Sequence, residues 1–184
     1  MPFHGQQILP AVRGMKDFES LVESRYHYIV LLDTHIGQLR SIVRFARKHD
    51  KKVLLHADLV QGLKNDEYAA QFLCQEVRPD GLISTRTKVV LTARKKGLLA
   101  IQRLFLLDSL ALETSYKLLR KTQPDFIEVL PGVMPHIITE VKDTAEIPIF
   151  AGGLIRSVDD VESALAAGAE AVTTSRKSLW EHFE

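Results

Sequence analysis

The chain has 184 residues, of which 46% are hydrophobic and 26% are charged. This composition can bury one full core, and the length fits a single barrel-sized domain over residues 1–184. Lysine and arginine number 24 against 23 aspartate and glutamate, which gives a formal net charge of +1. A basic coat over the whole surface is therefore excluded, and any contact with nucleic acid must be local.

The sequence indicates a cytoplasmic protein with no membrane segment. Cys74 is the only cysteine, so no disulfide can form within the chain. The N-terminal residues MPFHGQQILP lack the basic and then apolar pattern of a signal peptide. Apolar runs, such as residues 29–32 and 104–107, end far short of the roughly 20 residues that a membrane span needs.

Short runs rich in Val, Ile and Leu alternate along the chain with segments whose apolar residues recur at helical spacing. One such segment, residues 36–46, places its apolar side chains on one face. Gly97 and Gly168 are expected to end two helices, and Ser157 with Asp160 resembles a capping box. Eight strands are predicted, in chain order: Ile8 to Val12, Tyr28 to Asp33, Lys52 to Asp58, Gly81 to Arg86, Leu99 to Asp108, Phe126 to Gly132, Pro148 to Gly153 and Ala171 to Ser175.

Eight consecutive strand–helix units predict a compact α/β fold, the (β/α)8 or TIM-type barrel of parallel strands with outer helices. Each unit has about 23 residues, which a short strand, a helix and two loops nearly fill. No length is left for a second domain, so the loops and helices of the barrel must do all the recognition. A doubly wound open sheet is the alternative, because its sequence pattern is similar.

Two loops rich in glycine and hydroxyl groups follow the last two predicted strands, with the sequences AGGL (151–154) and VTTS (172–175). In phosphate-binding barrels these loops present backbone N–H groups to the anion, and glycine allows its close approach. Arg156 and Arg176 lie just beyond and could add charge-assisted hydrogen bonds. The alternative is a barrel corner with glycines for packing and hydroxyls as caps. The predicted phosphate site consists of Gly152, Gly153, Thr174 and Ser175.

Charged residues also lie at the ends of other predicted strands, where the loops of a barrel build its site. His56 and Glu128 are flanked by apolar residues, and a charge there is costly unless it is paired or faces a polar lumen. Asp33 and Asp108 could instead cap the helices that follow them. Together with Asp58, these side chains could hold a divalent cation. The chain would then be a metal-dependent enzyme acting on a small phosphate ester or phosphodiester.

Other familiar chemistry finds no support in the sequence. No lysine ends a predicted strand, so a Schiff-base aldolase would have no nucleophile. There is no Walker A, G-x-G-x-x-G or G-x-S-x-G motif and no Cys or His pair at zinc spacing, so we predict neither a cofactor nor a metal. Cys74 is expected in the core, next to Leu73 on a helix.

Ordered segments along nearly the whole chain also carry a family resemblance. They run from ILPA at 8–11 to LW at 179–180 and include HADL at 56–59 with GL at 62–63, DGLIST at 80–85, IQRLFLLDS at 101–109, EVLPG at 128–132 and AGGLI at 151–155. Together they resemble the glycerol uptake operon antiterminator family. The resemblance implies a non-enzymatic regulator that responds to glycerol-3-phosphate. Such a regulator acts on the leader mRNA of glycerol-catabolism operons and prevents transcription termination.

The resemblance also assigns roles to the predicted site. The two loops with Gly152, Gly153, Thr174 and Ser175 would hold the phosphate of glycerol-3-phosphate, the effector. The family pattern has a neutral polar residue at position 176, where this chain has Arg176. By their position at the mouth of the barrel, four polar residues would lie near the glycerol hydroxyls: Asp33, His56, Asp58 and Glu128.

The RNA-contacting surface is less visible in the sequence. Aromatic residues, which stack on unpaired bases, make up only 7% of the chain, and no RNA-binding module is recognisable. The sequence does contain two clusters of basic residues, although solvated helix faces or ordinary helix C-termini would also explain them. A second copy of the chain is a candidate partner, because a homodimer would widen a modest basic surface. Two clusters are candidates for RNA contact: Arg44, Arg47 and Lys48, near Lys51 and Lys52, and Arg94, Lys95 and Lys96.

Overall fold

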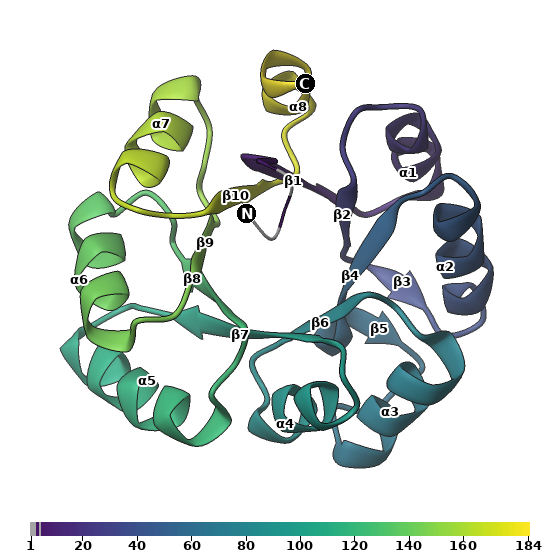
Figure 1. Cartoon of the computed structure of the whole chain (residues 1–184), viewed down its shortest axis with the longest axis horizontal. Coiled ribbons are helices and arrows are strands. Elements are labelled where there is room, and N and C mark those ends of the chain that lie inside the picture. Colours follow the sequence, from purple (N-terminus) through teal and green to yellow (C-terminus); the bar gives the residue numbers. More distant parts are fainter. Residues whose placement is uncertain (1–2, 4) are drawn as a thin grey trace.

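The computed structural model describes residue 3 and residues 5–184, which form a closed barrel of eight parallel strands surrounded by helices (Figure 1). The predicted TIM-type barrel is confirmed. The open-sheet alternative is wrong, because β1 (Ile8–Val12) pairs with β10 (Ala171–Thr174) and closes the sheet. Between them run β2 (Tyr28–Leu31), β4 (Lys52–His56), β6 (Gly81–Ser84), β7 (Leu99–Phe105), β8 (Phe126–Leu130) and β9 (Ile149–Gly152).

The helices cover the outside of the barrel and return the chain from the end of one strand to the start of the next (Figure 1). None of them, in the part of the chain that the structure describes, is long and apolar enough to cross a membrane. The α-helices are α1 (Met15–Val22), α2 (Leu39–Lys48), α3 (Glu67–Phe72), α4 (Thr87–Lys95), α5 (Ser109–Thr122), α6 (Pro135–Ala145), α7 (Val158–Ala166) and α8 (Lys177–Phe183).

Local sequence signals account for the boundaries of several helices. Asp108 caps α5 by accepting a hydrogen bond of 2.7 Å from the backbone N–H of Ala111. Ser157 and Asp160 form the predicted capping box at the start of α7. Gly97 and Gly168, which follow α4 and α7, have φ of +77° and +104°, a conformation that favours glycine.

Two short features were not predicted from the sequence. β3 (Thr34–His35) and β5 (Val60–Gln61) pair in parallel as a separate two-stranded sheet just beyond β2 and β4, with the 3-10 turn η1 (Ala57–Leu59) before β5. α3 continues as a π-helical turn, η2 (Leu73–Val77). Two-residue strands and a single π turn are too short to leave a periodic pattern in the sequence.

The core has two parts, one between strands and helices and one inside the barrel. The outer part includes Cys74, as predicted, whose thiol pKa burial raises to about 11. Inside the barrel, the end where the strands begin is closed by aromatic rings. Phe126 and Phe150 stack with their centroids 4.7 Å apart, and Phe3 lies edge-on to Tyr28 at 4.4 Å. The buried polar residues His56, Glu128 and Thr173 lie towards the opposite end, where the strands finish.

Candidate ligand-binding site

A pocket of about 280 Å³ opens at the end of the barrel where the strands finish. The loops after β9 and β10 form one side of it, as the sequence predicts for a site shared by the last two strands. Of the predicted phosphate site, Gly153, Thr174 and Ser175 line the pocket. The remaining lining comes from Ala11, Arg13, Val30, Leu32, Arg103, Glu128, Leu154, Ile155, Arg156, Thr173 and Arg176.

The loop after β9 turns sharply at the pocket. Gly153 and Leu154 both have positive φ, +77° and +61°. In residues 3 and 5–184, no hydrogen bond uses the backbone N–H of Leu154 or of Ser175, so both donors are available to an anion. Further along the loop, the N–H groups of Arg156 and Ser157 already donate to the carboxylate of Asp160.

Gly152 contributes to the site without lining the pocket. A Cβ at this position would lie 2.3 Å from the Thr173 hydroxyl and 3.0 Å from Glu128 Oε1. The missing side chain thus leaves room for the hydrogen bond of 2.7 Å that Thr173 donates to Glu128. The glycine predicted from phosphate binding is therefore required by the packing beneath the loop.

A charged network lies below the loops, inside the barrel. Arg103 Nε lies 3.0 Å from Glu128 Oε2, and the Glu128 side chain is only 3% exposed. This contact is an ion pair without hydrogen-bond alignment, and in the described part of the chain neither atom makes a hydrogen bond. Arg103 and Glu128 both line the pocket, so the charged pair lies where a polar ligand would be bound.

His56 supports this network from β4. Burial and the neighbouring Arg103 guanidinium lower its pKa to about 4, so the ring is neutral at pH 7. Its Nε2 contacts the Arg103 guanidinium and can only accept there, which places the proton on Nδ1. A neutral His56 therefore adds no charge to the site and orients Arg103.

The pocket carries an excess of positive charge. Four arginines line it, Arg13, Arg103, Arg156 and Arg176, against the single carboxylate of Glu128. This arrangement favours an anionic ligand. Arg13 and Arg103 were missed by the sequence prediction, although Arg13 directly follows the first predicted strand and Arg103 interrupts an apolar run in the fifth.

The other predicted polar residues have partners elsewhere. Asp33 accepts a hydrogen bond of 2.9 Å from Gln61 in β5. Asp58 accepts a hydrogen bond from the Ser84 hydroxyl. It also accepts from the backbone N–H and the hydroxyl of Thr85, both at 2.8 Å, and so fixes the loop after β6. Neither lines the pocket. Among the residues that the structure describes, no three His, Cys, Asp or Glu side chains are placed to share a metal ion.

The whole chain can now be compared with known proteins. Residues 8–180 match the family described as "Glycerol-3-phosphate responsive antiterminator". The chain belongs to this antiterminator family. The resemblance found in the sequence is thereby confirmed.

Solved structures of an antiterminator and of an antiterminator-related protein share the fold of this chain. The glycerol uptake operon antiterminator regulatory protein of Listeria monocytogenes is 49% identical, with 98% of each chain covered and a TM-score of 0.95. A glycerol uptake operon antiterminator-related protein of Thermotoga maritima is 26% identical, covering 96% of this chain and 98% of that one, with a TM-score of 0.84. In Escherichia coli K12, "Uncharacterized protein YgcP" is 33% identical over 93% of this chain and 91% of its own length.

The basic clusters predicted from the sequence lie far from the pocket. Arg47 and Lys48 are in the last turn of α2, and Arg94 and Lys95 are in the last turn of α4. Because the helices run opposite to the strands, these turns lie at the end of the barrel where the strands begin. All the predicted RNA-contact residues are exposed: Arg44, Arg47, Lys48, Arg94, Lys95 and Lys96.

Proposed function

We propose that this protein binds glycerol-3-phosphate in the pocket and, with the effector bound, prevents transcription termination in the leader mRNA of glycerol-catabolism operons in the cytoplasm. One observation supports the proposal above all others. The pocket joins two loops with available backbone N–H groups to a buried ion pair, so it offers anion donors at one end and hydroxyl partners at the other.

The effector would lie with its phosphate against the two loops. We place the phosphate at the turn of Gly152 and Gly153 and at Thr174 and Ser175, where a helix end and unused N–H groups favour negative charge. Arg13, Arg156 and Arg176 at the mouth would neutralise the rest of its charge.

The glycerol hydroxyls would meet Glu128 and Arg103. A carboxylate oxygen accepts from a hydroxyl and a guanidinium N–H donates to one, so this pair offers both an acceptor and a donor to the hydroxyls of a diol. His56 would act through Arg103. Asp33 and Asp58 would contact glycerol only by leaving their present partners, so the proposal centres on Glu128.

The role is regulatory, with no catalytic residue and no cofactor. An effector changes activity only if it binds one state of the protein better than another. We infer that glycerol-3-phosphate favours the state that binds RNA. In this proposal RNA contacts come from Arg44, Arg47 and Lys48 and from Arg94, Lys95 and Lys96.

Transcription in a purified system tests this function. The template carries a glycerol-operon leader with its terminator, and read-through is measured with the protein and glycerol-3-phosphate, glycerol or inorganic phosphate. Read-through should rise only with glycerol-3-phosphate. Phosphorus NMR of the protein with glycerol-3-phosphate and Mg²⁺ or Mn²⁺ should show the ester unchanged. Hydrolysis there, or read-through that ignores the effector, would contradict the proposal.

A further inference from the structure

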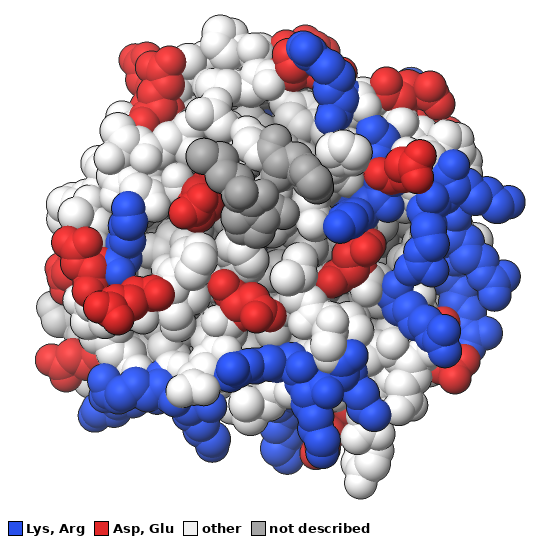
Figure 2. Space-filling view, in the orientation of Figure 1, with Lys and Arg blue, Asp and Glu red and all other residues white. Residues whose placement is uncertain are grey.

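The near-zero net charge of the chain conceals a strong separation of charge. Residues 40–121 contain 17 lysines and arginines but eight aspartates and glutamates, whereas the rest of the chain contains seven and 15. Figure 2 shows Lys and Arg gathered along the right and lower edges, over α2, α4 and α5, and acidic side chains on the left, along the top and near the centre of this face. One side of the barrel is thus basic, and the acidic residues lie mostly outside it.

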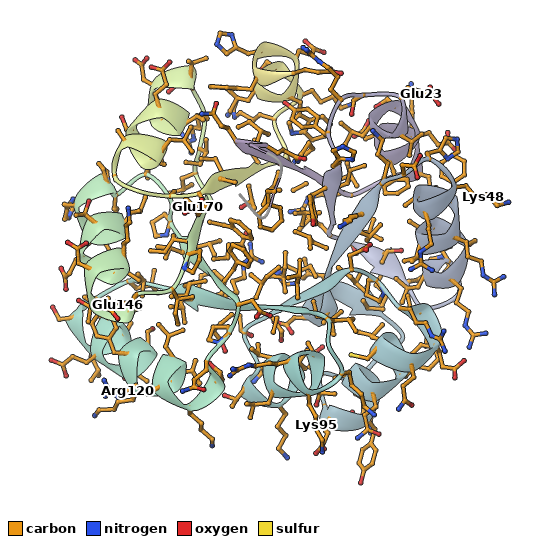
Figure 3. The ribbon with its side chains drawn as sticks, viewed as in Figure 1. Glu23, Lys48, Lys95, Arg120, Glu146 and Glu170 are labelled. Atoms are coloured by element: carbon orange, nitrogen blue, oxygen red, sulfur yellow. The ribbon has the colours of Figure 1, made fainter. Side chains whose placement is uncertain are left out.

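The basic side chains concentrate where the helices of residues 40–121 end. Figure 3 labels Lys48, Lys95 and Arg120 at these ends and Glu23, Glu146 and Glu170 around the remainder of the ring. Helix α2, the turn η2, α4 and α5 therefore share one cationic border. We call it the basic half-rim, and its residues are Arg44, Lys48, Arg78, Lys95, Lys96 and Arg120.

Side-chain contacts join these helix ends into one surface. Arg47 donates to the carbonyl of Arg78 at 2.9 Å, which links α2 to η2. Arg94 donates to Gln123 at 3.2 Å, which links α4 to the end of α5. Helix α3, which continues into η2, packs against α4 and joins these two pairs, so the two clusters seen in the sequence are parts of a single border.

Nearby carboxylates do little to neutralise the half-rim. Glu76 is paired with Arg40, and among the described residues no ion pair involves a residue of the half-rim. In residues 3 and 5–184, no hydrogen bond or ion pair engages the side-chain charges of Lys48 and Lys95, and both side chains are exposed. Unpaired positive charges repel each other, so the binding of a polyanion that spans them would be favourable.

We propose that the basic half-rim binds the sugar–phosphate backbone of the leader RNA, at the end of the barrel opposite the effector pocket. This inference rests on the proposed function. RNA carries a charge at each nucleotide, which fits cations spread over four consecutive helix ends. The acidic part of the ring repels the strand and so fixes its path. Effector and RNA then occupy opposite ends of the strands, and neither excludes the other.

Charge reversal on the half-rim tests the inference. The variants are Arg44→Glu/Lys48→Glu and Lys95→Glu/Lys96→Glu, with Lys16→Glu/Lys142→Glu as a control that makes the same charge change outside the half-rim. Fluorescence anisotropy measures Kd for a glycerol-operon leader transcript and for a single-stranded RNA of mixed sequence, in the presence of glycerol-3-phosphate and at several salt concentrations. Calorimetry measures glycerol-3-phosphate binding to each variant.

The half-rim variants should bind RNA at least tenfold more weakly, and their salt slope should fall by about 0.7 for each lost phosphate contact. The control should bind RNA within about threefold of the parent protein, and all variants should bind glycerol-3-phosphate as the parent does. If the half-rim variants bind RNA as the control does, the inference is wrong. If the parent protein binds neither RNA, the proposed function itself fails.

Discussion

The guanidinium of Arg103 on β7 and the carboxylate of Glu128 on β8 form an ion pair of 3.0 Å between adjacent, register-matched residues inside the barrel. Removing two charges from water costs free energy that their attraction offsets only in part, and a well-packed apolar pair in the same place is often as stable. The stability of the barrel therefore gives no reason for this pair. The polar ligand that we propose for the pocket would give one.

Replacing one partner of the ion pair should lower the stability of the protein strongly, whereas replacing both partners should not. Arg103→Met leaves the buried carboxylate of Glu128 without a positive charge beside it and should lower the free energy of unfolding by about 3–5 kcal/mol. Arg103→Met/Glu128→Leu should recover most of that loss in urea denaturation, yet neither variant should bind glycerol-3-phosphate. Retained effector binding in the double variant would show that the pair has no role in recognition.

The buried neutral His56 should make stability depend on pH. Its pKa is about 4 in the folded protein and about 6.5 when unfolded, so between these values the unfolded chain binds more protons. The contribution of neutral His56 to the free energy of unfolding is fully present above pH 6.5 and is lost as the pH falls towards 4. From pH 7 to pH 5 the loss from this group should be about 2 kcal/mol. His56→Gln removes the titrating group, so the free energy of unfolding of this variant should fall by about 2 kcal/mol less than that of the parent protein between pH 7 and pH 5. Equal losses would contradict the assignment.

A hydrogen bond from the last helix holds the end of β10, where we propose that the phosphate binds. The indole of Trp180 in α8 donates to the carbonyl of Thr174 at 2.8 Å. Trp180→Phe removes this hydrogen bond and should cost about 0.5–1.5 kcal/mol of stability and weaken glycerol-3-phosphate binding.

Tyr26→Phe provides the matched control for Trp180→Phe. The Tyr26 hydroxyl, whose pKa is raised to about 12 mainly by burial, donates to the Trp180 carbonyl at 2.7 Å and so anchors the same helix. This variant should lose stability but bind the effector with unchanged affinity. If both variants weaken binding equally, Trp180 acts only through the anchoring of α8.

Gly152 should tolerate a methyl group only when Thr173 makes room for it. Gly152→Ala places a Cβ 2.3 Å from the Thr173 hydroxyl and should destabilise the protein by about 1–3 kcal/mol. Gly152→Ala/Thr173→Ala should recover part of this loss. Thermal unfolding of the two variants and of Thr173→Ala measures the coupling. Strictly additive effects would mean that the clash is relieved elsewhere.

The barrel itself could be predicted because each strand–helix unit has its own apolar pattern and caps. All eight predicted strands are present. Several end one to three residues early, as at Asp33 and Arg86, because polar residues at the strand ends belong to the loops. Closure of the sheet could not be derived from these patterns, since it depends on pairing between residues at opposite ends of the chain.

The site was predictable in part. Gly153 and Thr174 were found because the loops after the last two strands have a characteristic composition and a fixed place in the fold. Arg103 was missed because its role depends on alternation inside a barrel, which turns it towards Glu128. Asp58 was given a role at the mouth, yet its carboxylate is occupied by Thr85 of the neighbouring loop. Such a contact between loops leaves no trace in local sequence.

Calorimetric titration with glycerol-3-phosphate tests the central claim most directly. Gly153→Asp places a carboxylate at the phosphate loop, and Gly153→Asn adds a neutral group of the same size at the same positive φ, which both residues tolerate. Like charges about 4 Å apart repel by about 4 kcal/mol at an effective dielectric constant of about 20, so binding should weaken on the order of a hundredfold or more in the Asp variant.

The parent protein should bind glycerol-3-phosphate more tightly than glycerol or inorganic phosphate, and the Asn variant should retain most of this affinity. Absence of binding by the parent protein, or equal weakening by Gly153→Asp and Gly153→Asn, would contradict a phosphate site at these loops.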